Sequence, residues 1–244
     1  MTSVLIEVCV DDADGLAAAI AGGADRIELC SALAVGGLTP SAGLMALAAK
    51  AAVPTYAMIR PRAGDFVYSE AELDVMTGDI EAARRTGLAG VVLGASLPDG
   101  RLDHAALARL VDAAAGMGLT LHRAFDLVPS IDDAIDLAVE LGFERILTSG
   151  GARSAPEGID VLERAITHAR GRISIMPGSG VTPDTVDPLI TRLAVSEVHS
   201  SCSTAVPNNN PAVVALGFAP PVERQTDAVL VQALKARLNR APCP

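Results

Sequence analysis

The stretch "GADRIELC" (residues 23–30) alternates charged or sulfur-bearing residues with apolar ones, and "GFERILTS" (142–149) repeats its pattern. The alignment places Arg26 opposite Arg145. The two stretches are the second and sixth of eight β-rich runs in the chain. A separation of four units is what a duplicated half-barrel would produce, so the repeat favours a barrel built from eight strands.

The segments between most of these runs have helical spacing, and Gly87 lies where a predicted helix ends. Strands that alternate with helices pair in parallel, and eight such units in about 250 residues are typical of an α/β (β/α)8 TIM barrel. A doubly wound open sheet is the alternative. The eight predicted strands cover residues 5–10, 26–30, 55–60, 90–94, 119–123, 145–150, 173–178 and 197–202.

The sequence predicts a single TIM-barrel domain over residues 1–244. Its last part leaves the repeat, because "AVPNNNPAVVALGFAPP" (205–221) is rich in proline and asparagine. We therefore expect an irregular connection over 204–223 and a C-terminal helix over 224–239.

Charge and composition exclude several classes of function. A net charge of −10 without a basic run argues against a nucleic-acid partner. The start "MTSVLIEVCV" has no basic segment before an apolar stretch, and no window reaches the ~20 apolar residues of a membrane span. Four cysteines without a C-x-x-C pair are expected to be reduced thiols. We predict a cytoplasmic protein without a membrane partner.

Alternation along the first two strands separates their side chains into two faces. Ile6, Val8 and Val10 form one uniformly apolar face, which we expect to contact the helices. The other face should then point into the barrel. It carries Glu7, Cys9, Arg26, Glu28 and Cys30. One interpretation is a neutralised structural network of paired charges, since barrel interiors are filled by side chains.

A second interpretation is a site at the carboxyl ends of the strands, where TIM barrels carry their active sites. His122 and Asp126 lie within "HRAFD", and Arg60 and Arg62 lie within "IRPRAGDFVYSE". Such residues suit an enzyme that uses histidine as acid or base and arginine as an anion clamp. Glu7 and His199 are further catalytic candidates, and Ser149 is a further candidate for substrate binding.

The turn "MPGSGVTPDT" (176–185) follows the seventh strand. Backbone amides at Gly178, Ser179 and Gly180 could bind a phosphate or another anion, because TIM barrels often hold phosphate in the loops after strands seven and eight. A tight turn without a ligand is the alternative interpretation.

Six blocks in order resemble the CutC copper-homeostasis family, a TIM-barrel family distinct from the choline lyase of the same name. They are "LIEVCV", "GGADRIELCSAL…GGLTPS", "MIRPRAGDFVYSE", "LHRAFD", "RILTSGG…A" and "IMPGSGV", and with the eighth strand they span about residues 4–202. The resemblance implies a cytosolic TIM barrel that binds copper, with Cys9 and Cys30 as the copper ligands. It also allows a homo-oligomer. His199 or Cys202 could add a third ligand.

Copper(I) is soft and accepts two thiolates in a near-linear arrangement. Adjacent strands lie about 4.8 Å apart, so Cys9 and Cys30 can share one ion if their register is level. We expect Arg26 and Arg60 to outweigh the nearby carboxylates and to lower the pKa of both thiols.

Two functional hypotheses follow, with a non-catalytic sensor barrel as a weaker third. One is copper(I) binding by cysteine thiolates at the barrel mouth. The other is a lyase, isomerase or hydrolase that acts on a small anionic or phosphorylated metabolite, so the expected partner is a metal ion or a small molecule.

Overall fold

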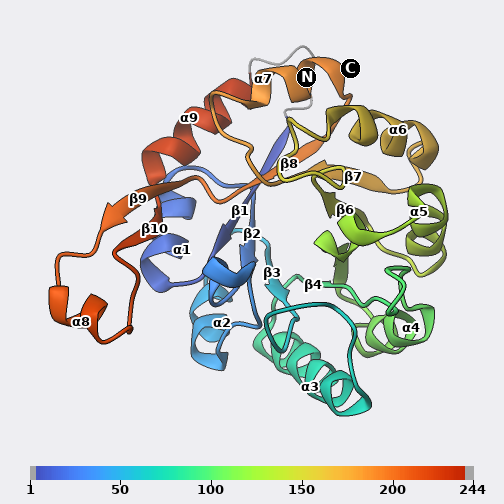
Figure 1. Cartoon of the computed structure of the whole chain (residues 1–244), viewed down its shortest axis with the longest axis horizontal. Coiled ribbons are helices and arrows are strands. Elements are labelled where there is room, and N and C mark those ends of the chain that lie inside the picture. The colour runs from blue at the N-terminus through green and yellow to red at the C-terminus, as the bar shows by residue number, and fades with distance from the viewer. Residues whose placement is uncertain (1–3, 240–244) are drawn as a thin grey trace.

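The central sheet is a ring of eight parallel strands in the order β7-β6-β5-β4-β3-β2-β1-β8 (Figure 1). The structure is a computed structural model that describes residues 4–239. β7 and β8 contact one another and bring the ring close to closure, which confirms the predicted (β/α)8 barrel. The strands are β1 (Leu5–Val10), β2 (Arg26–Leu29), β3 (Thr55–Met58), β4 (Gly90–Leu93), β5 (Gly118–Leu121), β6 (Arg145–Thr148), β7 (Ser174–Pro177) and β8 (Glu197–Ser200).

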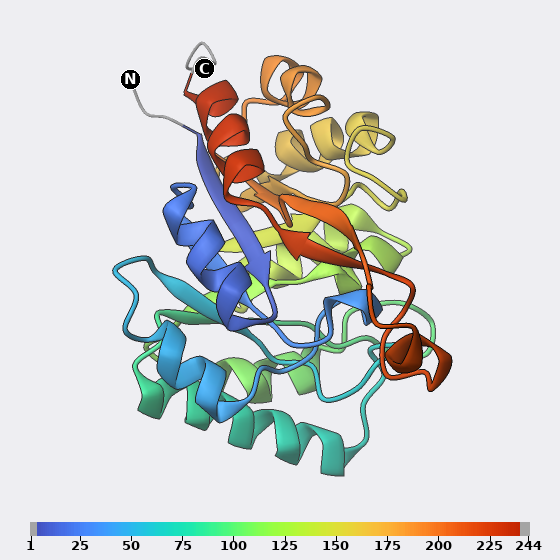
Figure 2. The same cartoon turned by 90° about the vertical axis from the view of Figure 1, so that its left-hand side faces the viewer.

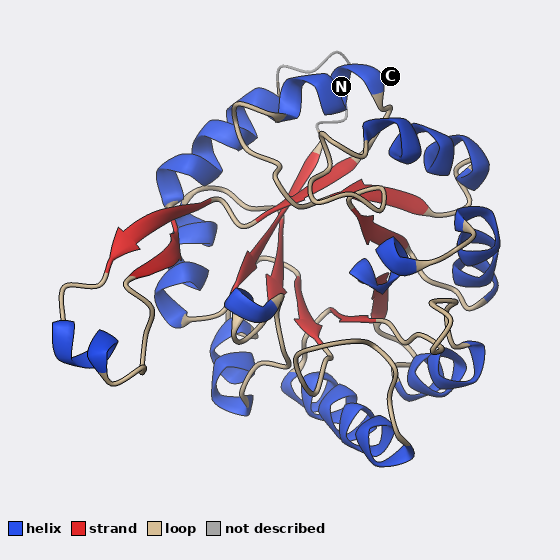
Figure 3. Ribbon diagram, viewed as in Figure 1, coloured by secondary structure: helices blue, strands red, loops and turns tan. Residues whose placement is uncertain are grey.

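Helices surround this ring on its outer side (Figure 3). Two short 3₁₀ helices, η1 and η2, follow the carboxyl ends of β2 and β5. The outer helices are α1 (Ala13–Ala21), α2 (Ala42–Ala48), α3 (Glu70–Thr86), α4 (His104–Ala113), α5 (Ile131–Glu140), α6 (Ile159–Ala169), α7 (Val186–Arg192) and α9 (Ala228–Leu238), and the 3₁₀ helices are η1 (Leu33–Val35) and η2 (Arg123–Leu127).

Helix α3 shows how local sequence sets these boundaries. Ser69 caps its first turn by accepting from the amide of Glu72, and the Glu72 side chain accepts from the Ser69 amide in return. Gly87 ends the helix at φ 86°, a left-handed conformation that glycine adopts without strain.

Two separate clusters of apolar side chains lie on the two faces of the strands. Ile6, Val8 and Ile27 belong to the large cluster between the strands and the helices. Cys30 and Met58 belong to a small cluster inside the ring, together with Tyr56 and Val92. The two faces predicted from alternation are therefore confirmed for β1 and β2.

The region after β8 differs from the expected irregular connection over 204–223. β9 (Ser203–Pro207) and β10 (Val222–Thr226) form an antiparallel ribbon, and α8 (Pro211–Ala215) lies at its tip. The ribbon projects to the left of the barrel in Figure 1 and faces the viewer in Figure 2. Proline and asparagine predicted a loop here, but they occupy the tip and the start of α8, where Asn210 caps the helix and Pro211 opens it.

Helix α9 is also shorter than the predicted 224–239, because β10 takes up the first of those residues and Asp227 caps the helix. In residues 4–239, no helix combines the length and the apolar character that crossing a membrane requires.

Candidate metal centre

Three neighbouring strands bring the candidate residues together inside the barrel. β1 pairs with β2 and with β8, and the register sets Glu7 level with both Arg26 and His199. Two residues further along, Cys9 is level with Glu28. Because these positions share the inward face, their side chains meet near the carboxyl ends of the strands.

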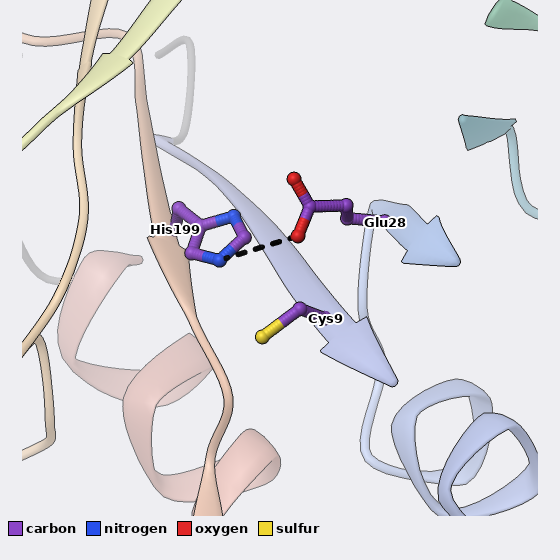
Figure 4. Close-up of side chains that lie close together, drawn as sticks. All are labelled: Cys9, Glu28 and His199. Atoms are coloured by element: carbon purple, nitrogen blue, oxygen red, sulfur yellow. Dashed lines mark ion pairs between the residues drawn. The ribbon is translucent and has the colours of Figure 1, made fainter. Parts of the chain in front are cut away.

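Cys9, Glu28 and His199 form a buried cluster that could hold a metal ion (Figure 4). One ligand atom from each residue lies within 4.8 Å of the other two. His199 Nε2 is 3.9 Å from Glu28 Oε2. The cluster offers a sulfur, a nitrogen and an oxygen donor from three different strands.

The imidazole of His199 is oriented by Glu7. Nδ1 of His199 donates to Glu7 Oε1 at 2.8 Å, and this bond leaves Nε2 on the side of the cluster. Glu7 is fully buried and also accepts from Arg26, whose guanidinium forms a second ion pair with Glu197. The orientation of the ring is therefore fixed by a chain of charged contacts.

The same chain of charges continues across the barrel below the cluster. Arg145 Nε lies 3.3 Å from Glu197, and its Nη1 donates to Thr120 at 2.9 Å. Tyr56 lies between the guanidinium groups of Arg26 and Arg145, 5.6 and 4.9 Å from its ring centre. The structural network of paired charges expected for the interior is thus present, directly beneath the metal-ligand cluster.

The pKa values of the two carboxylates nearest His199 are shifted in opposite directions. Burial acts to raise the pKa of Glu7, but the bond with His199 and the charge of Arg26 outweigh it and lower that pKa to about 2. Burial raises the pKa of Glu28. For His199 burial acts to lower the pKa, but Cys9 and Glu28 raise it well above its usual value.

The expectation that arginines lower the pKa of the thiols is wrong. Burial raises the pKa of Cys9, and burial together with the nearby Glu28 raises that of Cys30 well above its usual value. The reason is that Arg26 is paired with carboxylates. Arg60 instead donates to the backbone carbonyls of Val35, Gly37 and Gly64.

The level register that Cys9 and Cys30 would need to share one ion is not present. Cys9 is opposite Glu28, and Cys30 follows two residues later, where its amide donates to the carbonyl of Val10. The Cys30 thiol lies 3.5 Å from Glu28 Oε2 and packs with Met58. Alternation fixes which face a residue occupies, whereas the stagger between strands fixes which residues meet.

Asp126 and Ser149 lie together at the ends of β5 and β6. Asp126 accepts from Arg123 at 2.6 Å, from Thr148 at 2.5 Å and from the Ser149 hydroxyl at 3.0 Å. The Ser149 hydroxyl also lies 2.6 Å from the carbonyl of Ala152. These bonds join two loops of the rim.

Arg62 and His122 lie apart from the metal-ligand cluster. Arg62 pairs with Glu72 at 2.5 Å and stacks over Tyr68 on the outer loop. His122 is buried, and its Nδ1 accepts from the amide of Ala124 at 3.1 Å. Its Nε2 has no hydrogen-bond partner among residues 4–239.

The turn at Gly178, Ser179 and Gly180 follows β7. The Gly178 amide donates to the carbonyl of Thr148 and is therefore used within the barrel. Ser179 and Gly180 both have positive φ, 71° and 70°, and the Ser179 hydroxyl donates to the carbonyl of Arg153. A β-carbon at Gly178 would overlap Leu147 and approach the Cβ of His199 to 3.2 Å. Anion binding at this turn remains a prediction.

Sequence reasoning missed two roles. Glu197 joins Arg26 to Arg145, and its alternation with His199 in "EVHS" was the signal that it also points inward. Glu28 was interpreted only as a structural carboxylate, because nothing in a single strand shows that it lies opposite Cys9.

Comparison with known proteins agrees with the fold and the sequence blocks. A model of the CutC family matches residues 4–204. A family protein CutC from Rhizobium meliloti is 66% identical over 239 residues, 98% of both chains. One from Caulobacter vibrioides is 55% identical over 236 residues, 96% of both chains.

Solved structures show the same relationship. A structure described as that of a proposed copper homeostasis protein CutC from Streptococcus agalactiae is 34% identical, with a TM-score of 0.78, and covers 81% of this chain and 98% of that one. N-(5'-phosphoribosyl)anthranilate isomerase from Pyrococcus furiosus, 13% identical with a TM-score of 0.58 over 96% of this chain and 98% of that one, shares the barrel fold alone. The chain belongs to the CutC family.

Proposed function

We propose that this protein binds copper(I) at the carboxyl end of its barrel, as a copper-homeostasis protein of the cytoplasm. The observation that carries the proposal is the cluster of Cys9, Glu28 and His199, whose ligand atoms lie within 4.8 Å of one another. Membership of the CutC family and the relative described as a copper homeostasis protein support it.

The chemistry of Cys9 and His199 suits copper(I). A thiolate is the soft ligand that copper(I) prefers, and an imidazole is a common second ligand. The proton on His199 Nδ1 is held by Glu7, so Nε2 faces the ion and presents a lone pair once the ion has displaced the Nε2 proton. The raised pKa of the Cys9 thiol means that copper must displace a proton when it binds.

Cys30 is the second thiol of the proposed site. It lies beside Glu28 rather than opposite Cys9, with its thiol 3.5 Å from Glu28 Oε2. We assign the primary pair to Cys9 and His199 and give Cys30 a supporting role, as a second sulfur to which copper(I) transfers.

The test is a competition between the reduced protein and a chromophoric copper(I) chelator. We expect Cys9→Ser and His199→Asn each to weaken copper(I) binding by at least about 100-fold, and the double change Cys9→Ser, Cys30→Ser to abolish it. His104→Asn is the matched control, because His104 is exposed on α4. Unchanged binding in Cys9→Ser and in the double variant would overturn the proposal.

An enzyme acting on a small anionic or phosphorylated metabolite has less support. Its expected anion clamp, Arg60, is bonded to backbone carbonyls, and Asp126 is bonded to side chains of its own rim. His122 lies against Phe66, with ring centres 4.7 Å apart, rather than beside a charged partner that could exchange a proton with it.

A further inference from the structure

The ligand cluster contains a carboxylate that copper(I) does not need. Glu28 is 3% exposed, and its Oε1 has no hydrogen-bond partner within residues 4–239. Its Oε2 is held only loosely, 3.5 Å from the Cys30 thiol and 3.9 Å from His199 Nε2. A buried carboxylate with a free oxygen is costly unless a cation or a donor satisfies it.

Charge balance indicates which cation would satisfy Glu28. Glu7 and Glu197 are already matched by Arg26 and Arg145. A metal that binds the Cys9 thiolate and the Glu28 carboxylate meets two further negative charges. Copper(I) balances only the thiolate, whereas a divalent ion neutralises both the thiolate and the carboxylate.

The donor set indicates the divalent ion. Cys, His and Glu donors are those of zinc(II), and three protein ligands with one open position are the pattern of its non-structural sites. Around tetrahedral zinc, ligand atoms about 2.0–2.3 Å from the ion lie roughly 3.3–3.8 Å from one another. The 3.9 Å between His199 Nε2 and Glu28 Oε2 needs only a small adjustment.

The hydrogen bonds made by the ligand residues themselves also match those of a zinc site. A histidine that binds zinc commonly donates its other ring N–H to a carboxylate, which fixes the ring and strengthens the ligand. His199 does this with Glu7 at 2.8 Å, and Glu7 is fixed in turn by Arg26.

We propose that the same site binds zinc(II) through Cys9 Sγ, His199 Nε2 and a Glu28 oxygen, with one coordination position left for an exchangeable ligand. The inference rests on the ligand cluster of the proposed function but not on copper. Glu28 then distinguishes the two metals, because it coordinates zinc(II) and does not coordinate copper(I).

The test measures both metals on the same variants. Glu28→Gln keeps the size and shape of the side chain and removes its charge. We expect it to weaken zinc(II) binding by at least about 100-fold in competition with a chromophoric zinc chelator, and to change copper(I) binding by less than about threefold. Cys9→Ser should weaken the binding of both metals, and His104→Asn, the matched control on the exposed face of α4, should leave zinc(II) binding unchanged.

Cobalt(II) in place of zinc(II) supplies a second readout. The wild-type protein should show a sulfur-to-cobalt charge-transfer band, which Cys9→Ser removes and His104→Asn retains. Thermal unfolding followed by circular dichroism identifies any variant that fails to fold.

Equal zinc(II) affinity in wild type and Glu28→Gln would overturn the inference, as would a cobalt(II) spectrum that Cys9→Ser leaves intact. Copper(I) binding that depends on Cys9 would leave the proposed function standing in either case. Zinc(II) binding that depends on Glu28, in a protein that does not bind copper(I), would instead support this inference and overturn the proposed function of copper(I) binding.

Discussion

Glu7 joins two charged partners in the interior of the barrel. It accepts from His199 and Arg26 while fully buried. Removing one partner of a buried charged network leaves the other partner buried and unpaired, which costs far more than losing a surface ion pair.

We therefore expect Glu7→Gln to lower the free energy of unfolding by about 3–5 kcal/mol. Glu81→Gln is the matched control, because the pair of Glu81 and Arg85 is exposed on α3, and it should change stability by less than about 0.5 kcal/mol. Urea unfolding at neutral pH measures both. A loss from Glu7→Gln as small as that of the control would contradict this role of Glu7.

His122 gives the molecule a specific pH dependence. Burial, and then the charge of Arg60, lower the pKa of His122 to about 3, below its usual 6.5. Between pH 6.5 and 3 the unfolded chain binds the proton and the folded chain does not. The contribution of neutral His122 is therefore fully present above pH 6.5 and is lost as the pH falls towards 3.

His122→Asn should remove this dependence, because the Asn side chain can still accept from the amide of Ala124 without taking a proton. We expect the free energy of unfolding of wild type, relative to the variant, to fall by up to about 1.4 kcal/mol for each pH unit below 6. Denaturant unfolding at several values between pH 4 and 7 measures it. Parallel curves for the two proteins would show that His122 titrates normally.

At the scale of elements, side-chain faces were predictable and strand registers were not. The uniformly apolar face of β1 fixed which of its residues point inward, since the period of a strand is two. The partner of Cys9 depends on the stagger between β1 and β2, and one strand's sequence carries no record of that stagger. The sequence therefore predicted that Cys9 points inward but did not identify Glu28 as the residue opposite it.

The turn after β7 packs against the His199 side chain. Gly178 has no side chain, and this absence leaves room for Leu147 and for the Cβ of His199. We expect Gly178→Ala to lower the free energy of unfolding by about 1–3 kcal/mol and to weaken metal binding by displacing His199. Titration with a metal chelator and urea unfolding measure the two effects.

Gly78 provides the control for that change. It lies inside α3, where an added β-carbon meets nothing within 4 Å, so Gly78→Ala should stabilise the protein by up to about 1 kcal/mol and leave metal binding unchanged. Metal affinity that is the same in Gly178→Ala and Gly78→Ala would contradict the link between the turn and His199.

At the scale of the whole molecule, the barrel was predictable because its unit of strand and helix repeats along the chain. The projecting ribbon of β9 and β10 was not predictable, since it occurs only once. Eight units of strand and helix gave the same pattern many times, so errors at single boundaries did not change the topology. β9 and β10 are short, half-exposed strands without a buried face, and asparagine and proline between them predict a loop.

Pairing of β8 with β1 is what assembles the site, because the candidate metal ligands come from opposite ends of the chain. Cys9 and Glu28 lie on the first two strands, and His199 lies on the eighth, which pairs with the first. No local motif could assemble these residues. The candidate metal site forms only when these strands pair, so an ion bound there should stabilise the folded chain against unfolding.

The most direct measurement is an anomalous-difference map from a crystal of the reduced protein loaded with copper(I). The account predicts one strong peak about 2.0–2.3 Å from Cys9 Sγ and His199 Nε2. A strong peak bound elsewhere, with the Cys9, Glu28 and His199 side chains unliganded, would contradict it.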